Sequence, residues 1–222
     1  MSSAIRTSSL ALASAVLITS HAAAQGTDEG FEFWLNPSLS HDLTDRTGVE
    51  LETAQRWRSA EDGRADTYFY RLWLNHDAAP GVTVSGAVEY RINDGAADET
   101  RLMQQVSARH GIWRTRLRLE QRFVENAAQT GLRIRPRLGV SVPLDEAGRW
   151  SFKSDAELFV TLQATSPSGD EGLTGLRTQI GFGYKINERL SLSAAYLRQQ
   201  DFFSTRPDVV GHAPIIAIDY SF

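Results

Sequence analysis

Residues 112–124 read Ile-Trp-Arg-Thr-Arg-Leu-Arg-Leu-Glu-Gln-Arg-Phe-Val. Successive side chains of a β-strand point to opposite faces, so this stretch has two faces of different chemistry. The charged face carries Arg114, Arg116, Arg118, Glu120 and Arg122. The other face carries Trp113, Leu117, Leu119 and Phe123, which can contact hydrocarbon. Such a segment is typical of a strand in a β-barrel that crosses the outer membrane of a bacterium.

The C-terminal segment follows the same pattern. It reads Ile216-Ala217-Ile218-Asp219-Tyr220-Ser221-Phe222 and places alternate apolar and aromatic side chains on one face. This tail resembles the C-terminal strand signal by which outer-membrane barrels are recognised for assembly. We therefore expect Tyr220 and Phe222 to act as an assembly signal read by the barrel assembly machinery.

Alternating segments recur along the rest of the chain, each close to the length that a tilted strand needs to cross a membrane. Short connectors rich in Asp, Gly, Asn and Pro alternate with longer polar ones, as in barrels with periplasmic turns and outer loops. The eleven predicted segments are 31–41, 48–58, 67–77, 82–93, 100–110, 112–124, 132–142, 150–163, 176–186, 190–200 and 212–222. The sequence thus predicts an all-β, antiparallel transmembrane β-barrel of 10 to 12 strands.

An odd strand count is awkward, because bacterial antiparallel barrels have an even number of strands. Either residues 31–41 form a plug or partial strand on a ten-stranded barrel, or one strand of twelve is not recognised. Pro136, in the seventh segment, removes a ladder hydrogen bond and predicts a bulge there.

Length and composition fit one exported domain. The 222 residues are 41% hydrophobic and 23% charged, enough for a single domain. Residues 1–24 are predicted to be a secretory signal peptide, with Arg6, an apolar stretch over 10–18 and a cleavage pattern at 22–24. The barrel domain is then 25–222, and we expect it in the outer membrane of a Gram-negative bacterium, in contact with lipid and lipopolysaccharide.

Charge and cysteine usage exclude several functions. Removing residues 1–24 takes away one arginine and no acid, so the net charge changes from −4 to −5, which argues against a nucleic-acid partner. The absence of cysteine excludes disulfides, thiol chemistry and a lipid-bearing cysteine. We find no cofactor motif and no metal-ligand spacing.

Charged side chains inside a barrel should pair, because ionised groups in a narrow, partly dehydrated interior are costly without partners. Hairpin parity places Glu120 beside Arg133 and Arg135, and it places the strand of Arg133 to Arg137 opposite Asp155 and Glu157. The predicted lumen-lining ladder is Arg114, Arg116, Arg118, Glu120, Arg122, Arg133, Arg135, Arg137, Asp155, Glu157, Glu89 and Arg91. Further candidates are Glu50, Glu52, Arg56, Arg71, Arg177 and Lys185.

Two roles fit such a ladder. It can be structural, with planar guanidinium groups bridging carboxylates on neighbouring strands. It can also be a selectivity surface for anionic solutes, because seven arginines face one glutamate on the sixth and seventh segments. We favour the structural role, since small barrels are commonly filled by their side chains.

Other readings stay open. A soluble secreted barrel that binds a hydrophobic ligand would show the same alternation with its apolar face inward. A lipid-modifying hydrolase could use Ser38 or Ser40 with His41 and Asp42, or Ser107 with His110, but neighbours on a strand point to opposite faces and no nucleophile motif is present. We expect no enzyme activity. Asp170 and Glu171 could bind calcium, yet they lack the spacing of a calcium loop.

Several motifs together resemble a protein family. They are Glu-Phe-Trp at 32–34, Glu-x-x-x-Arg at 52–56, Leu-Arg-Leu-Glu-Gln-Arg-Phe at 117–123, Arg-Ile-Arg-Pro-Arg at 133–137, Ala-Glu-Leu-Phe at 156–159 and Gly-Phe-Gly-Tyr at 181–184. Over most of the chain this arrangement is similar to a family of Gram-negative β-barrels known only as a domain of unknown function. The resemblance implies an outer-membrane barrel and brings no catalytic residues.

Overall fold

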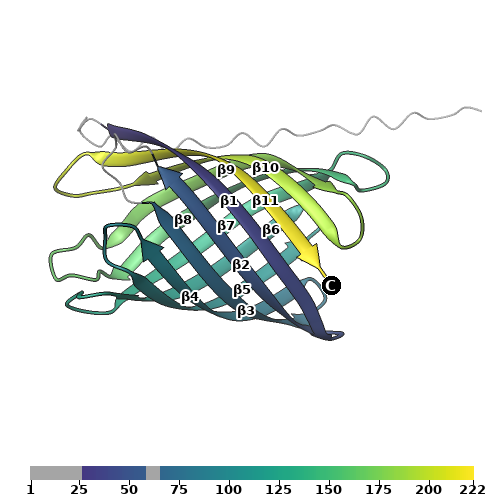
Figure 1. Ribbon diagram of the computed structural model, residues 1–222, viewed down its shortest axis with the longest axis horizontal. Helices are drawn as coiled ribbons and strands as arrows, with labels where there is room; N and C mark the ends of the chain where they lie inside the picture. The colour runs from purple at the N-terminus through teal and green to yellow at the C-terminus, as the bar shows by residue number, and fades with distance from the viewer. Residues whose placement is uncertain (1–26, 59–65) are drawn as a thin grey trace, which may run out of the picture.

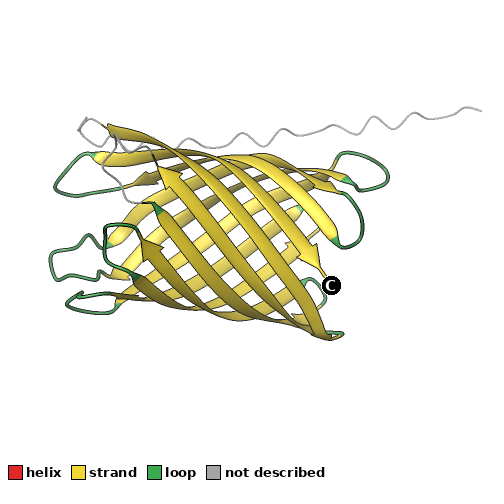
Figure 2. Cartoon of the chain, viewed as in Figure 1, coloured by secondary structure: helices red, strands yellow, loops and turns green. Residues whose placement is uncertain are grey.

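A computed structural model of the chain describes residues 27–58 and 66–222, which form strands joined by turns and loops (Figure 2). The predicted signal peptide and the connector at 59–65 lie outside the described residues. The strands are β1 (Thr27–Thr44), β2 (Thr47–Arg58), β3 (Thr67–Ala79), β4 (Val82–Asn93), β5 (Glu99–His110), β6 (Trp113–Val124), β7 (Gly131–Pro143), β8 (Trp150–Gln163), β9 (Gly172–Lys185), β10 (Leu190–Asp201) and β11 (Asp208–Ser221). No helix within these described ranges is long and apolar enough to cross a membrane.

The strands form one closed barrel in which each strand pairs with its neighbours in sequence (Figure 1). All consecutive pairs are antiparallel, and β1 closes the barrel by pairing in parallel with β11, from Thr27 opposite Asp208 to Ser40 opposite Ser221. The predicted all-β barrel of eleven segments is confirmed. Both explanations offered for the odd count are wrong, because residues 31–41 belong to a complete strand and no twelfth strand is needed.

The parallel closure follows from the odd number. In a chain of hairpins the first and eleventh strands run in the same direction, and parallel strands can still exchange a full ladder of hydrogen bonds. We call the parallel pairing of β1 with β11 the seam. At its C-terminal end the Ser38 hydroxyl donates to Asp219 at 2.7 Å, and the Phe222 amide donates to the Ser40 carbonyl at 3.1 Å. The N-terminal end of β1 and the C-terminal Phe222 therefore lie at opposite ends of the barrel (Figure 1).

The connectors differ between the two ends. One end carries the tight turns, including Pro80-Gly81 between β3 and β4, and the other carries the longer loops, such as residues 164–171 between β8 and β9. Gly81 has a φ of 73°, and a Cβ there would lie 2.7 Å from the Arg109 carbonyl oxygen, so the turn requires glycine. Phe222 lies at the end with the tight turns (Figure 1).

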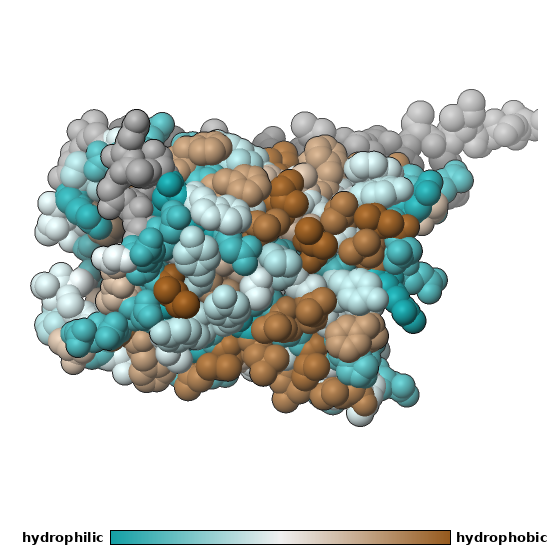
Figure 3. Space-filling model, in the orientation of Figure 1, coloured by the Kyte–Doolittle hydropathy of each residue, from teal (hydrophilic) through white to brown (hydrophobic). Residues whose placement is uncertain are grey.

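The two faces of the barrel wall differ as the alternation predicts. In the described residues thirty-four large apolar or aromatic side chains are exposed, whereas only eleven apolar residues are buried, and fourteen polar or charged residues are buried. On the face shown in Figure 3, apolar side chains gather towards the end with tight turns, and the loop end is more polar. Inside, one apolar cluster on β1, β10 and β11 is formed by Trp34, Leu197, Ala213 and Ile215.

The predicted bulge at Pro136 is wrong. Pro136 pairs with Leu117 of β6 without a shift, and the β7–β8 register is the same before it, at Ile134 opposite Val160, and after it, at Arg137 opposite Glu157. The ladder to β8 only skips Arg135 and Pro136, because proline has no amide hydrogen to donate. The register shift in this pair lies between Leu132 and Arg133, near the strand end.

Candidate functional site

Two buried carboxylates organise the interior wall formed by β6, β7 and β8. Glu120 lies directly opposite Arg133 across the β6–β7 ladder. Its Oε2 accepts from Arg133 Nη2 at 2.6 Å, and its Oε1 accepts from Arg135 Nη1 at 2.6 Å. The second nitrogen of Arg135, Nη2, donates to Glu157 Oε2 at 2.6 Å. Arg135 thus bridges two carboxylates that are 0% and 1% exposed.

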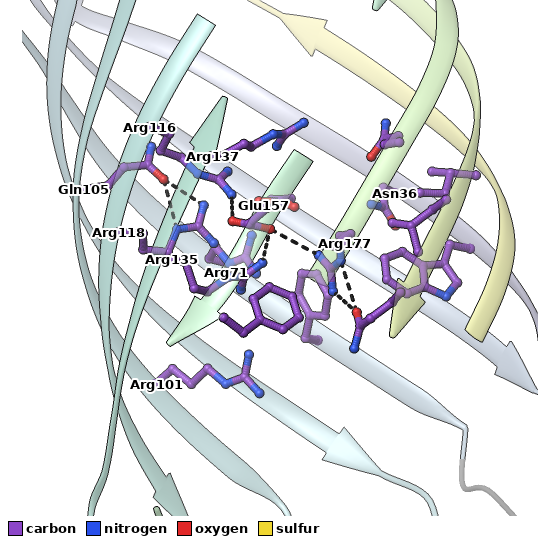
Figure 4. Close-up of a pocket in the computed structure, with 18 of the residues that line it drawn as sticks. Asn36, Arg71, Arg101, Gln105, Arg116, Arg118, Arg135, Arg137, Glu157 and Arg177 are labelled. Carbon is purple, nitrogen blue, oxygen red and sulfur yellow. Dashed lines mark hydrogen bonds and ion pairs between the residues drawn. The ribbon is translucent and has the colours of Figure 1, made fainter. Parts of the chain in front are cut away.

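Glu157 collects further arginines from neighbouring strands (Figure 4). Arg116 of β6 donates to its Oε1, and Arg177 Nη1 of β9 lies 3.8 Å from its Oε2. Arg137 pairs with Asp155 on β8. The same Arg177 donates its Nε and Nη2 to the neutral amide oxygen of Gln199. Charge-assisted hydrogen bonds, which are roughly twice as strong as neutral ones, therefore link β6, β7 and β8, and the longer Arg177–Glu157 ion pair adds β9.

A second network joins β2, β3, β4 and β5. Glu89 is 0% exposed, and it accepts from Arg71 Nε at 2.8 Å and from Arg91 Nη2 at 2.8 Å. Arg71 also donates to Glu52 at 2.6 Å. Arg101 Nη1 lies 3.6 Å from Glu89, so this network continues onto β5.

A third carboxylate, Glu99 at the start of β5, connects that network to β6. It pairs with Arg101 at 2.6 Å on its own strand and with Arg122 of β6 at 2.6 Å. Arg118 of β6 donates to the Gln105 amide oxygen at 2.8 Å and lies 3.8 Å from Glu120. Ion pairs between interior side chains thus occur on every strand from β2 to β9.

The structure brings together eleven of the twelve residues predicted for the ladder. Arg114 stands apart, because its Nη1 donates to the carbonyl oxygens of Gly111 and Trp113 at the adjacent tight turn. The sequence reasoning missed Glu99, because the predicted strand began at residue 100, and it missed Arg101 inside that strand, because no partner for it was sought. Hairpin parity across the connector at 94–98 would have found them, because Arg91 lies opposite Glu99.

Several interior arginines also lie over aromatic rings. The guanidinium of Arg71 lies 4.6 Å from the Phe69 ring centre, and that of Arg135 lies 4.5 Å from the Phe159 ring centre. Cations over aromatic faces within about 6 Å are attracted by the ring quadrupole, by about 2 kcal/mol or more when desolvated. The rings therefore let several cations share a small interior.

In the described part of the barrel, the interior charges line a middle cavity and a second cavity towards the loop end. The middle one has a volume of about 480 Å³ and is lined by eleven arginines and five carboxylates. The arginines are Arg56, Arg58, Arg71, Arg91, Arg101, Arg116, Arg118, Arg133, Arg135, Arg137 and Arg177, and the carboxylates are Glu50, Glu52, Asp155, Glu157 and Asp201. The other, of about 880 Å³, lies towards the loop end. Lys185 lies in neither of them and lines a smaller cavity beside the tight turns.

The residues considered for a hydrolase are not arranged as a triad in the described part of the chain. Ser38 donates to Asp219, and His41 Nδ1 lies 2.8 Å from the Phe222 carbonyl oxygen. No hydrogen bond joins Ser107 to His110 within the described ranges. Those ranges also contain no cluster of metal-binding side chains. Hydrogen bonds from Ser204 hold the pKa of the Asp170 carboxyl below its usual value, so this loop residue is engaged within the protein.

The two residues of the predicted assembly signal lie on the outer face at the end of the seam. Tyr220 and Phe222 are 37% and 62% exposed, and the Phe222 ring stacks on His41 of β1 with the ring centres 4.8 Å apart. The last residue of the chain thus also contacts the first strand.

The fold and the interior define a closed eleven-stranded β-barrel with an arginine–carboxylate network inside. The family model described as "Protein of unknown function (DUF2490)" matches residues 31–210, and the chain belongs to that family. No curated protein matches the chain. The resemblance noted from the sequence motifs is confirmed as far as a family of unknown function, and its placement in the outer membrane stays a prediction.

Proposed function

We propose that this protein is a nonenzymatic β-barrel of the Gram-negative outer membrane, with a structural role and a charged interior. The observation that carries the proposal is the inverted distribution of side chains. Exposed apolar residues such as Leu72, Val88 and Leu138 occupy the outer face, and ionised residues such as Glu89 and Glu120 are fully buried. In water such an outer face would expose far more contiguous apolar surface than soluble monomers do.

The inversion argues against a soluble barrel with a hydrophobic ligand. Such a protein would line its cavity with apolar side chains. Here the middle cavity is lined mainly by arginine and carboxylate side chains. The apolar side chains of Trp34 and Leu197 form only part of the wall of that cavity, so they do not make an apolar binding pocket.

Aromatic side chains support placement in a bilayer. Trp57, Trp113 and Trp150 lie near strand ends and are 38%, 46% and 47% exposed. Amphipathic rings are enriched at membrane interfaces, where one edge is wet and the body is apolar. In this placement the partners are lipid and lipopolysaccharide outside the barrel, and the assembly machinery reads the strand that ends at Phe222.

The interior supports a structural role over free transport. Arginines from β6, β7 and β9 meet at Glu157, and others meet at Glu89, so cross-strand bonds tie distant parts of the wall together. These long side chains project into the interior, where they line cavities of about 480 and 880 Å³ rather than leaving a wide open channel.

The odd strand number makes the proposal testable by topology. If the tight turns face the periplasm, Phe222 does too, and Asp28 at the start of β1 lies at the cell surface. The chain has no cysteine, so single-cysteine variants report one position each. On intact cells a membrane-impermeant maleimide should label Asp28→Cys and leave Glu188→Cys, in the β9–β10 turn, unlabelled until the cells are lysed.

Fractionation provides the companion experiment. The wild-type protein should be recovered in the outer-membrane fraction and should migrate faster on a denaturing gel before heating than after. Recovery as a freely soluble periplasmic protein, with neither cysteine labelled on intact cells, would overturn the proposal.

A further inference from the structure

One buried arginine on β2 has no carboxylate partner. Arg56 is 8% exposed, and its Nε is enclosed without a hydrogen-bond acceptor. In the described residues its guanidinium makes no ion pair. Each of the other ten arginines that line the middle cavity has a carboxylate oxygen within 4.0 Å. A buried cation is costly unless it is paired, so this exception needs a physical explanation.

The surroundings of Arg56 orient its donors. Its guanidinium carbon lies 3.8 Å from the centre of the Trp34 ring, which pairs with it across the β1–β2 ladder. The five N–H donors of a guanidinium lie in its plane. A ring stacked on the face leaves these donors at the edge free to reach another acceptor.

A second, weakly compensated arginine shares the same ring. The guanidinium carbon of Arg177 lies 5.2 Å from the Trp34 ring centre. Arg177 donates to the neutral amide of Gln199, and its ion pair with Glu157 is long, at 3.8 Å. The Trp34 ring thus lies beside two cations, one with no carboxylate of the described residues within 4.0 Å and one whose ion pair is 3.8 Å long.

Arg56 lies where the two interior cavities meet along the barrel axis. It lines both the middle cavity and the cavity at the loop end, together with Trp34, Arg58, Arg91, Arg101, Leu197, Gln199 and Asp201. We name this shared boundary the waist. Arg91 and Arg101 already hold Glu89 and Glu99, so at the waist the uncompensated donors belong to Arg56.

We propose that the waist binds the carboxylate or phosphate group of a small solute, with Arg56 as the principal ligand and Arg177, which lines the middle cavity beside the waist, as the second. A planar guanidinium matches both groups by two parallel hydrogen bonds. The adjoining cavities, about 480 and 880 Å³, are in the size range of small-molecule sites. The proposal needs only the closed barrel, so it stands or falls independently of the membrane placement.

Binding is measured on the purified full barrel in detergent micelles, by calorimetry at constant ionic strength. Inorganic phosphate and succinate are the two probes. The probe that binds with the higher affinity identifies the group that the site prefers. Arg56→Gln should weaken the binding of that probe at least tenfold. Arg114→Gln removes the same charge near a tight turn and should change the affinity less than twofold.

Stability gives a second readout that does not depend on calorimetry. A ligand that binds only the folded state stabilises it. Phosphate or succinate should therefore raise the urea midpoint of the wild-type barrel and not that of Arg56→Gln. Without either probe, Arg56→Gln should unfold at the same or a higher urea concentration than the wild type, because it removes an unpaired buried cation.

Arg56→Lys separates charge from the planar fork. It keeps the cation and loses the two parallel donors, so its affinity should lie between those of the wild type and Arg56→Gln. Absence of binding of both probes at 10 mM, or equal binding by the wild type and Arg56→Gln, would overturn the proposal.

Discussion

Glu157 is the position where a single substitution tests the structural role of the interior network most sharply. Glu157→Gln keeps the shape of the side chain and removes its charge. The carboxylate is 1% exposed, accepts from Arg116 and Arg135, and lies 3.8 Å from Arg177. Arg135 retains Glu120, but Arg116 loses the only ion pair that it has within the described residues.

The size of the effect follows from these contacts. Two hydrogen bonds to a charged group contribute about 1.5–3 kcal/mol each. Breaking a buried pair by removing one partner typically costs about 3–5 kcal/mol, because the remaining charge is left buried. We expect Glu157→Gln to lower the free energy of unfolding by about 3–5 kcal/mol. Adding Arg116→Gln should restore part of the loss, because it removes the unpaired cation.

The assay is urea unfolding of the barrel reconstituted in lipid vesicles, followed by tryptophan fluorescence and by heat-modifiable migration. Arg149→Gln is the control, because its pair with Asp145 is long, at 3.9 Å, and Arg149 is 59% exposed. That change should cost less than about 1 kcal/mol. If Glu157→Gln costs no more than Arg149→Gln, or Arg116→Gln adds a further loss to it, the network does not hold the barrel together.

Three further predictions concern the outer face, assembly and the interior. Leu138→Arg, at a side chain that is 54% exposed, should destabilise insertion into vesicles by about 2–4 kcal/mol, and inward-facing Ser141→Arg should be milder; the reverse order would invert the assigned faces. Deleting Phe222 removes its ring stack on His41 and its backbone hydrogen bond to Ser40. Immunoblots of membrane fractions should then show less folded barrel, with export of the chain unchanged. Phe222→Tyr is the control and should keep the wild-type amount of folded barrel. The purified wild-type protein in planar bilayers should give no steady conductance. Reproducible anion-selective channels would contradict the structural role and indicate a transport path through the interior.

The strands could be predicted because a barrel wall imposes a period of two on almost every segment. The segment at 112–124 became β6 (Trp113–Val124), and the segment at 82–93 became β4 with the same bounds. Most strand starts at the loop end were predicted too late, as at β9, which begins at Gly172 rather than 176, whereas β3 begins at residue 67 as predicted. There the chain continues the ladder through Gly172 and Gly175, which carry no side chain to show the alternation.

Closure could not be predicted, because alternation identifies strands and not the edges that pair. Nothing in residues 27–44 shows that their partner is a parallel strand almost two hundred residues later. The same limit applies to the site. Glu120 and Arg133 follow from one hairpin, whereas Arg177 reaches Glu157 and Arg56 stacks on Trp34 through strand order and side-chain packing in the closed barrel.

The central claim is that the apolar outer face contacts lipid while the charged face lines the interior. Two neighbouring residues on one strand lie at about the same depth and face opposite sides of the wall, so they test this claim as a pair. Ile180 is 50% exposed, and its neighbour Gln179 lines the middle cavity. Val106 is 48% exposed, and its neighbour Gln105 also lines the middle cavity. Each residue is replaced by a single cysteine carrying a fluorophore, and quenching by brominated lipids is measured in vesicles. The account predicts strong quenching at positions 180 and 106 and little at 179 and 105. Equal quenching within each pair, or quenching at 179 and 105 alone, would contradict it.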